Sequence, residues 1–382
     1  MRKLLIVGLL SVLLPGCAWL KGGEDNSVPP AELQPLVSQV NISRLWERRV
    51  GNGSKEQFVR LTPAVDDGRI FVADRDGQVS ALDAETGKPL WSVDLKRPVS
   101  SGVGVGEGLV LVGTTEAEVI ALNWSDGAEI WRSVVSSEVL GAPAAAEGTV
   151  VVQSVDGNVA GLDVASGERR WILDRTVPTL SLRGTSSPLL VRGGAITGFA
   201  SGKLIAIELK RGLPVWEATI AVPRGRSELD RMVDIDSSPS IWGDQLYTVT
   251  YQGNVAAVDG ANGQIAWSRG MSSPVGLDVD FRQVYVTDED SNLWALDRRS
   301  GASMWKQTGL HNRALTRPAA LSNYVAAADF EGWLHVFSRI DGEELGRVRI
   351  DSSGVLASPV VADDTLYVYT NGGTLAAYRV TQ

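Results

Sequence analysis

The residues of this chain that could do chemistry are few and widely spaced. Its 382 residues include two histidines, His311 and His335, and one cysteine, Cys17. A zinc site needs several His or Cys ligands, and a thiol nucleophile needs a base beside it. His335 lies in an alternating strand pattern, which predicts a half-buried structural residue. A Ser–His–Asp triad stays open, although no nucleophile-elbow pattern supports one.

Two other patterns resemble ligand sites but lack the necessary context. The alternate glycines at 102, 104, 106 and 108 look like a phosphate loop, yet no helix follows them. The acidic turn at 288–290 does not have the spacing of a calcium loop. The net charge of −9 argues against nucleic-acid binding, which favours basic faces. We therefore predict a non-catalytic protein without cofactor, metal or nucleic-acid partner.

A repeat organises the rest of the chain. The stretch 73–91, ADRDGQVSALDAETGKPLW, recurs in variant form at 155–171, 251–267 and 289–305. Each copy has a turn, an alternating run ending in Asp, a second turn ending in Gly, and a Trp four residues later. A period of about 40 residues is typical of propellers and solenoids. Each repeat reads as four short antiparallel strands without a helix between them, which is a propeller blade.

The recurring tryptophan fixes the number of blades. It stands at Trp46, Trp91, Trp131, Trp171, Trp216, Trp267 and Trp305. Gly346 takes its place in the seventh repeat, and the eighth stops after three strands. The strand around Trp46 has no strands before it, so we expect it to complete the last blade and close the ring. The predicted fold is all-β: an eight-bladed propeller over residues 42–382.

Because the Trp and Asp residues recur around the ring, we interpret them as structural residues and not as parts of a binding or catalytic site. A tryptophan on the outer strand can fill the wedge between neighbouring blades while its N–H reaches a carbonyl. The repeated aspartates at strand ends are expected to accept backbone N–H groups in the turns; they are Asp83, Asp163, Asp259 and Asp297.

The repeat is interrupted in one region. Successive Trp-to-Trp spacings from Trp91 to Trp305 are 40, 40, 45, 51 and 38 residues. The two longest are adjacent, and the extra residues fall at 176–186 and 221–237, between the last strand of one blade and the first of the next. Connectors of this type share one face of a propeller, so we expect both loops on one rim. Long loops on a rigid scaffold commonly carry function.

The composition of these two loops suits a protein–protein contact. They combine apolar and charged side chains: Leu180, Leu182 and Met232 with Arg183, Arg231, Asp234 and Asp236. Leucine supplies buried area, and Arg and Asp orient a partner. In the alternative interpretation, the loops only cover the ring and satisfy each other by Arg–Asp pairing.

The N-terminus has the pattern of a lipoprotein signal. Residues 1–16 have a basic start and a short apolar stretch, and they end in Leu-Pro-Gly directly before Cys17. We expect cleavage there, lipidation of Cys17, and a flexible tether over 17–41. The following Ala18 favours transfer to the outer membrane. The alternative is an ordinary secretory signal with an incidental cysteine.

The repeat resembles that of pyrroloquinoline-quinone (PQQ) dehydrogenases, which are also eight-bladed propellers. That resemblance implies a quinoprotein as the alternative function. The chain lacks the paired cysteines typical of the alcohol dehydrogenases in that group, and it is shorter.

The whole chain is more similar to the BamB family, lipoproteins of the machinery that assembles β-barrels in the Gram-negative outer membrane. The segments 180–184 (LSLRG) and 228–236 (ELDRMVDID) carry that resemblance. It implies a lipid-anchored scaffold on the periplasmic face of the outer membrane, docked on the POTRA domains of BamA. The implied contact residues are Leu180, Leu182, Arg183, Asp234 and Asp236. Free edges of outer strands could also pair with nascent outer-membrane proteins.

Overall fold

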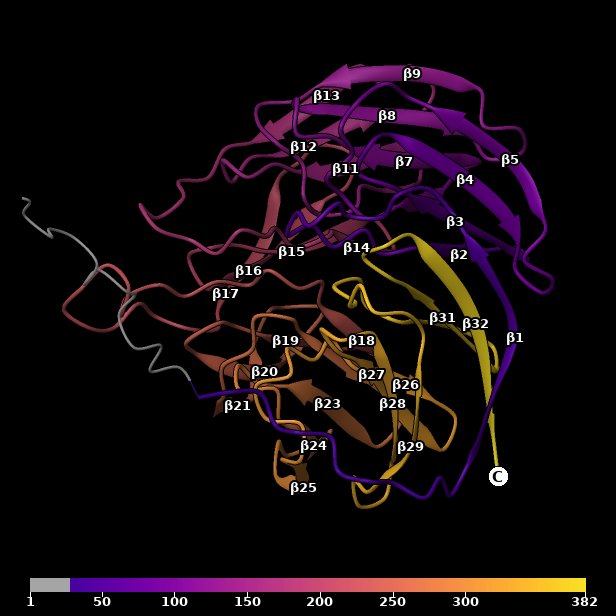
Figure 1. The fold of residues 1–382 in the computed structure, drawn as a ribbon. Helices are drawn as coiled ribbons and strands as arrows, with labels where there is room; N and C mark the ends of the chain where they lie inside the picture. The colour runs from indigo at the N-terminus through magenta and orange to yellow at the C-terminus, as the bar shows by residue number, and fades with distance from the viewer. Residues whose placement is uncertain (1–27) are drawn as a thin grey trace, which may run out of the picture.

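The computed structural model describes residues 28–382, which form strands and loops without a helix. The strands make eight sheets of four antiparallel strands each, arranged as blades around a central axis (Figure 1). The predicted eight-bladed propeller is therefore confirmed.

The first four blades use the strands β2 to β17. Blade one has β2 (Ala64–Asp66), β3 (Arg69–Ala73), β4 (Gln78–Asp83) and β5 (Pro89–Asp94). Blade two has β6 (Gly104–Gly106), β7 (Leu109–Gly113), β8 (Glu118–Asn123) and β9 (Glu129–Val134). Blade three has β10 (Ala144–Ala146), β11 (Thr149–Gln153), β12 (Val159–Asp163) and β13 (Arg169–Leu173). Blade four has β14 (Leu189–Val191), β15 (Gly194–Gly198), β16 (Lys203–Glu208) and β17 (Pro214–Thr219).

The other four blades use the remaining strands. Blade five has β18 (Ser240–Trp242), β19 (Gln245–Val249), β20 (Asn254–Asp259) and β21 (Ile265–Gly270). Blade six has β22 (Leu277–Val279), β23 (Gln283–Thr287), β24 (Leu293–Asp297) and β25 (Ser303–Gln307). Blade seven has β26 (Ala319–Leu321), β27 (Tyr324–Ala328), β28 (Trp333–Ser338) and β29 (Glu344–Arg349). Blade eight has β30 (Val360–Ala362), β31 (Thr365–Tyr369), β32 (Thr374–Thr381) and β1 (Asn41–Arg49).

The N-terminal strand closes the ring, as predicted. β1 pairs antiparallel with β32, from Asn41 opposite Thr381 to Arg49 opposite Thr374. The two strands lie side by side in one sheet, indigo against yellow in Figure 1. The backbone hydrogen bonds complete blade eight with a strand from the other end of the chain, and the chain then continues from β1 into blade one.

The core lies between the blades. The second strand of each blade is packed on both faces by neighbouring sheets, so it reads as a continuous apolar run. β7, with the sequence LVLVG, is buried at every position.

Seven tryptophans join each blade to the next, as the sequence predicts. Trp171, for example, donates its indole N–H to the Leu209 carbonyl of blade four at 2.9 Å. Its ring rests on Gly212, where a Cβ atom would lie 2.5 Å from a ring carbon and φ is +70°. The turn aspartates also act as predicted, since Asp297 accepts the N–H groups of Arg299 and Ser300.

In blade seven, Gly346 stands where the other blades have the tryptophan, and this has a structural cause. In the other blades, the tryptophan packs on the glycine of the turn between the third and fourth strands of the next blade. Blade eight has no such turn, because its third and fourth strands come from opposite ends of the chain. Residues before β1 fill the wedge instead: a Cβ atom at Gly346 would lie 2.6 Å from Ser38 Oγ and 3.2 Å from Val40.

Residues 28–40 form an irregular segment that we call the strap. The sequence predicts a flexible tether over 17–41, but within the described residues this segment lies against blades six and seven. Ala31 N donates to the His311 carbonyl at 2.9 Å, and Gln39 N donates to the Leu345 carbonyl at 2.7 Å. The predicted signal peptide (1–16) and Cys17 lie outside the described residues. No helix in 28–382 is long and apolar enough to span a membrane.

Candidate docking site

The two long connectors extend from the same side of the ring. The first follows β13 and precedes β14, and the second follows β17 and precedes β18. Both project to the left of the blades in Figure 1. The expectation that they share one rim is therefore confirmed.

Hydrogen bonds join the two loops into one unit. The Leu182 backbone N–H donates to Asp234 Oδ2 at 3.1 Å. Ser186 Oγ donates to the Ser237 carbonyl at 3.2 Å. The second loop is also bound to blade five, because Tyr251 N donates to the Asp234 carbonyl at 2.8 Å. A partner would therefore meet a preformed surface.

The structure places the two predicted contact aspartates inside this unit. Asp234 is 3% exposed and Asp236 is 9% exposed. Asp236 packs against Gly184 so closely that a Cβ atom there would lie 2.6 Å from the carboxyl carbon. These side chains hold the loops together, and their burial leaves little surface for a partner. The sequence could not show this, because an irregular loop has no period that fixes which side chains point inward.

Burial also changes the acidity of this carboxyl pair. It raises the pKa of Asp234, and the neighbouring Asp236 raises that pKa further. Burial likewise raises the pKa of Asp236, while the Arg60 guanidinium opposes the shift. Two interacting buried carboxyls titrate as a pair, and their raised pKa values favour one proton on the pair, which removes one of two buried like charges.

Arg60 comes from the segment between β1 and β2, far from the two loops in sequence. It donates through Nη2 to the Pro274 carbonyl at 2.8 Å. It lines, with Asp236, Arg183 and Arg317, a cavity of about 270 Å³ next to the loops. Among residues 28–382, no three His, Cys, Asp or Glu side chains converge as a metal-binding group.

The other predicted contact residues lie at or near the surface. Leu180 is 40% exposed, and Leu182 is half-buried beside its hydrogen bond to Asp234. Arg183 has a side chain that is 49% exposed and pairs with Glu138 at 2.9 Å. Glu138 belongs to the connector between blades two and three, so this arginine does not pair with an aspartate of the other loop. The alternative of Arg–Asp pairing is therefore wrong for Arg183.

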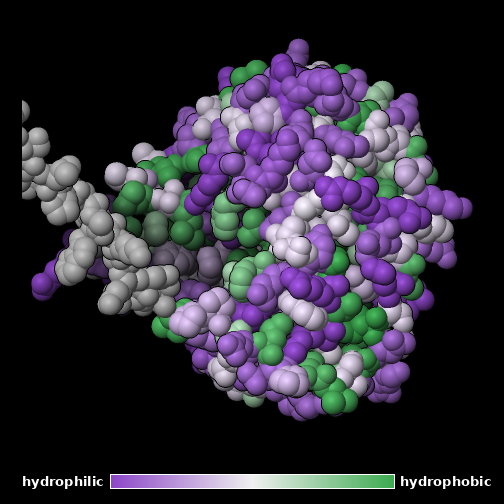
Figure 2. Space-filling model, viewed as in Figure 1, coloured by the Kyte–Doolittle hydropathy of each residue, from purple (hydrophilic) through white to green (hydrophobic). Residues whose placement is uncertain are grey.

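The sequence prediction missed two exposed apolar residues of the second loop. Leu229 is 64% exposed and Val222 is 59% exposed. Leu229 stands on a single tight turn: Asp230 N donates to Ser227 Oγ at 3.1 Å, and Ser227 N donates to Asp230 Oδ2 at 3.2 Å. The reciprocal Ser-x-x-Asp capping pattern was the available signal for this turn. Figure 2 shows hydrophobic residues gathered beside a hollow on the side where the loops project.

Comparisons with known sequences identify relatives over the whole chain. A family model described as outer membrane protein assembly factor BamB matches residues 43–93 and 75–307. The chain is 50% identical to the outer membrane protein assembly factor BamB of Pseudomonas aeruginosa, over 97% of each chain. It is 35% identical to the protein of that name from Yersinia pestis, over 99% of each chain.

Solved structures show the same architecture. The crystal structure of BamB from Moraxella catarrhalis matches 89% of this chain and all of its own, with a TM-score of 0.81 and 25% identity. A quinohemoprotein alcohol dehydrogenase from Comamonas testosteroni matches 88% of this chain and 76% of its own, with a TM-score of 0.68 and 16% identity. The dehydrogenase shares the fold alone.

Proposed function

The chain belongs to the BamB family of outer membrane protein assembly factors, and on that premise we propose that it is a scaffold that docks on the periplasmic POTRA domains of BamA. The docking surface consists of the two loops 176–186 and 221–237. Docking would orient the POTRA domains or present substrate to them.

One observation carries this proposal: the two longest connectors of the ring are bonded to each other and present apolar side chains to solvent. Leu180 and Leu229 are exposed on this rim, and Arg183 lies beside Leu182. Exposed leucines beside an arginine, on a surface that is already ordered, are suited to a protein interface. Little conformational entropy would be lost on binding, because the loops are held before the partner arrives.

We propose a division of roles within the implied contact set. Leu180, Leu182 and Arg183 would touch the partner, and their exposure at or near the surface supports this. Asp234 and Asp236 act through the loops, as positioning residues. We add Leu229 to the proposed contact residues because its side chain is 64% exposed.

Leu180→Glu should weaken capture of a purified BamA periplasmic fragment by about tenfold or more, because it removes an apolar contact and adds a charge to the interface. Binding can be measured by biolayer interferometry, and the fold by its melting temperature. Leu213→Glu is the matched control, since Leu213 is 49% exposed in a turn at the opposite edge of blade four. Equal capture by both variants would refute the docking surface.

We further propose that residues 1–16 are removed and that Cys17 carries the lipid that holds the protein on the periplasmic face of the outer membrane. Support comes from the Leu-Pro-Gly-Cys sequence and from relatives named as outer membrane assembly factors. Cys17→Ser should move the protein from the outer-membrane fraction to the soluble periplasm. Retention of the variant in the membrane fraction would contradict lipid anchoring.

The scaffold assignment replaces the quinoprotein alternative. The dehydrogenase match is limited to the fold at 16% identity, whereas the assembly-factor relatives match the chain end to end. A non-catalytic role is therefore the proposal that these relatives support.

A further inference from the structure

The strap is held on the propeller through its backbone carbonyl groups. Arg313 Nη1 donates to the Ala31 carbonyl at 2.9 Å, and Asn312 Nδ2 donates to the Val28 carbonyl at 2.9 Å. Arg347 donates through Nη2 to the Gln34 carbonyl. Two arginines from different parts of the chain therefore hold the strap at points three residues apart.

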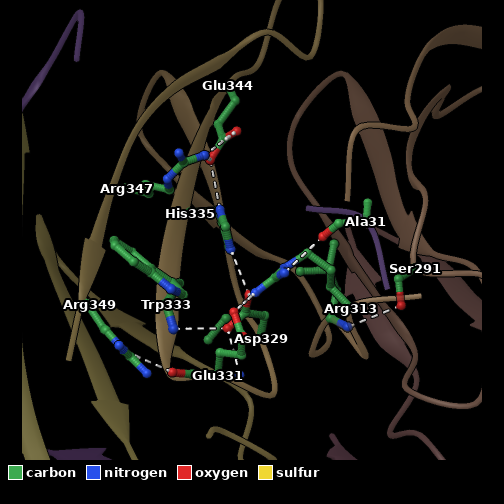
Figure 3. Close-up of polar contacts among 12 residues, drawn as sticks. Ala31, Ser291, Arg313, Asp329, Glu331, Trp333, His335, Glu344, Arg347 and Arg349 are labelled. Carbon is green, nitrogen blue, oxygen red and sulfur yellow. Dashed lines mark hydrogen bonds and ion pairs between the residues drawn. The ribbon is translucent and has the colours of Figure 1, made fainter. Parts of the chain in front are cut away.

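A chain of charged side chains, buried at Arg313, Asp329 and His335, joins these two arginines (Figure 3). Arg313 is 3% exposed and pairs with Asp329, which is fully buried, at 2.6 Å. Arg347 pairs with Glu344 at 3.5 Å. His335 lies between the two carboxylates: its Nε2 is 3.2 Å from Asp329 Oδ2 and its Nδ1 is 2.7 Å from Glu344 Oε1.

This geometry sets the protonation state of His335. A carboxylate can only accept hydrogen bonds, so each ring nitrogen that faces one must carry a hydrogen. The arrangement therefore requires the imidazolium form of the ring. In neutral imidazole, one nitrogen would turn a lone pair toward a buried carboxylate, and that contact would become repulsive.

Charged and titratable groups surround the ring from blade seven, from the 308–318 connector and from blade six. On blade seven the charged neighbours are Asp329, Glu344 and Arg347, with Glu331 bound to Arg313. The 308–318 connector supplies Arg313. From blade six, Tyr285 lies in the cluster beside Phe337, and its hydroxyl bonds to Asp280 and Gln283. Phe337 stacks on the imidazole with ring centroids 6.2 Å apart.

We propose that His335 is a protonation-dependent latch that fastens the strap to blades six and seven and releases it as the pH rises. Loss of the ring proton breaks one link between the two carboxylates and turns a ring-nitrogen lone pair toward one of them. Arg313 and Arg347 are then less firmly positioned toward the Ala31 and Gln34 carbonyls.

The direction of the pH response agrees with the electrostatics. Burial works against the charged ring, but the hydrogen bonds to Asp329 and Glu344 outweigh it and raise the pKa of His335. A histidine with a raised pKa in the folded state contributes its full stabilisation below about pH 6.5, its unfolded value, and loses it as the pH passes the folded value. The strap is therefore expected to be released when the pH rises above the pKa of His335 in the folded protein.

Strap release would change the reach of the anchor, a consequence that rests on the proposed lipidation of Cys17. With the strap docked, residues 17–28 can span at most about 40 Å. With the strap free, residues 17–41 can span about 85 Å. The latch would therefore set how far the propeller can move from the membrane surface.

Hydrogen exchange of the full-length protein tests the latch. The amides of Ala31 and Gln39 are bonded to blades six and seven, so their protection factors report strap docking. After correction for intrinsic exchange rates, protection in 28–40 should fall about tenfold between about pH 6 and about pH 9.5, as expected for loss of one charged hydrogen bond. Constant protection over that range would overturn the proposal.

Two matched variants identify the titrating group. His335→Gln cannot titrate and cannot donate to both carboxylates, so its strap should show low protection at every pH. His311→Gln removes the chain's only other histidine side chain and should keep the pH response. The opposite pattern, with the response lost in His311→Gln and kept in His335→Gln, would refute the assignment. Binding to BamA uses the rim of blades three to five, so failure of docking would not affect these results.

Discussion

Asp234→Asn is expected to raise the free energy of unfolding at about pH 8 and to leave docking on BamA intact. The amide oxygen introduced at position 234 can still accept the Leu182 N–H, and the amide NH₂ group can donate to Asp236. The substitution therefore keeps the link between the loops and removes the cost of holding a proton on a buried carboxyl at a pH where the unfolded chain releases it. Urea unfolding at several pH values would measure the effect.

The sign follows from the proton balance. An unfolded aspartate loses its proton near pH 4, whereas burial raises the pKa of Asp234 in the folded protein. Between those values the folded state holds more protons, so its stability falls as the pH rises. Between the unfolded and folded pKa values, the free energy of unfolding falls by about 1.4 kcal/mol for each pH unit. An asparagine side chain cannot lose a proton, so the two proteins should differ little near pH 4 and diverge above it.

Binding to BamA distinguishes a positioning role of Asp234 from the direct partner contact that the family resemblance implies. Asp234→Ala removes the acceptor for the Leu182 N–H and should weaken BamA capture by loosening the first loop. Asp234→Asn should bind like the natural protein. If Asp234→Asn folds normally but loses BamA, the carboxylate itself contacts the partner and the positioning role is wrong.

The architecture could be predicted because it depends on repeated positions. Trp and Gly recur at fixed spacing, and their spacing gave the blades, the ring closure and the two long loops. Gly346 shows what the spacing of repeated residues cannot predict. A repeat shows that a residue is missing, but not that residues near the N-terminus, such as Ser38, fill the space.

The strap and the loop interior were not predictable, for two different reasons. The strap is recognised through the carbonyls of Ala31 and Gln34, and every residue type has such a carbonyl. Its Pro-rich composition therefore reads as a tether although it is bound. Asp236 is buried beside a cavity that Arg60, from a distant segment, also lines, so its burial depends on tertiary structure that no local pattern shows.

Trp171→Ala is expected to cost about 3–5 kcal/mol of unfolding free energy, the range for truncating a buried tryptophan. Trp171 is 9% exposed, packs on Gly161 and Gly212, and donates to the Leu209 carbonyl. Urea unfolding would measure the loss. Trp242→Ala is the control, because Trp242 is 41% exposed and should change stability little. Similar losses for both would contradict the wedge role of Trp171.

A tryptophan added at position 346 is not expected to stabilise the ring. The repeat alone would suggest that Gly346→Trp restores a missing wedge. Blade eight, however, offers no glycine turn to receive the indole, and Ser38, Val40 and Ile42 already occupy the space. The substitution should destabilise by about 1–3 kcal/mol, as overpacking does. A tryptophan therefore joins two blades only where the next blade has a turn to receive it, and the ring closure removes that turn from blade eight.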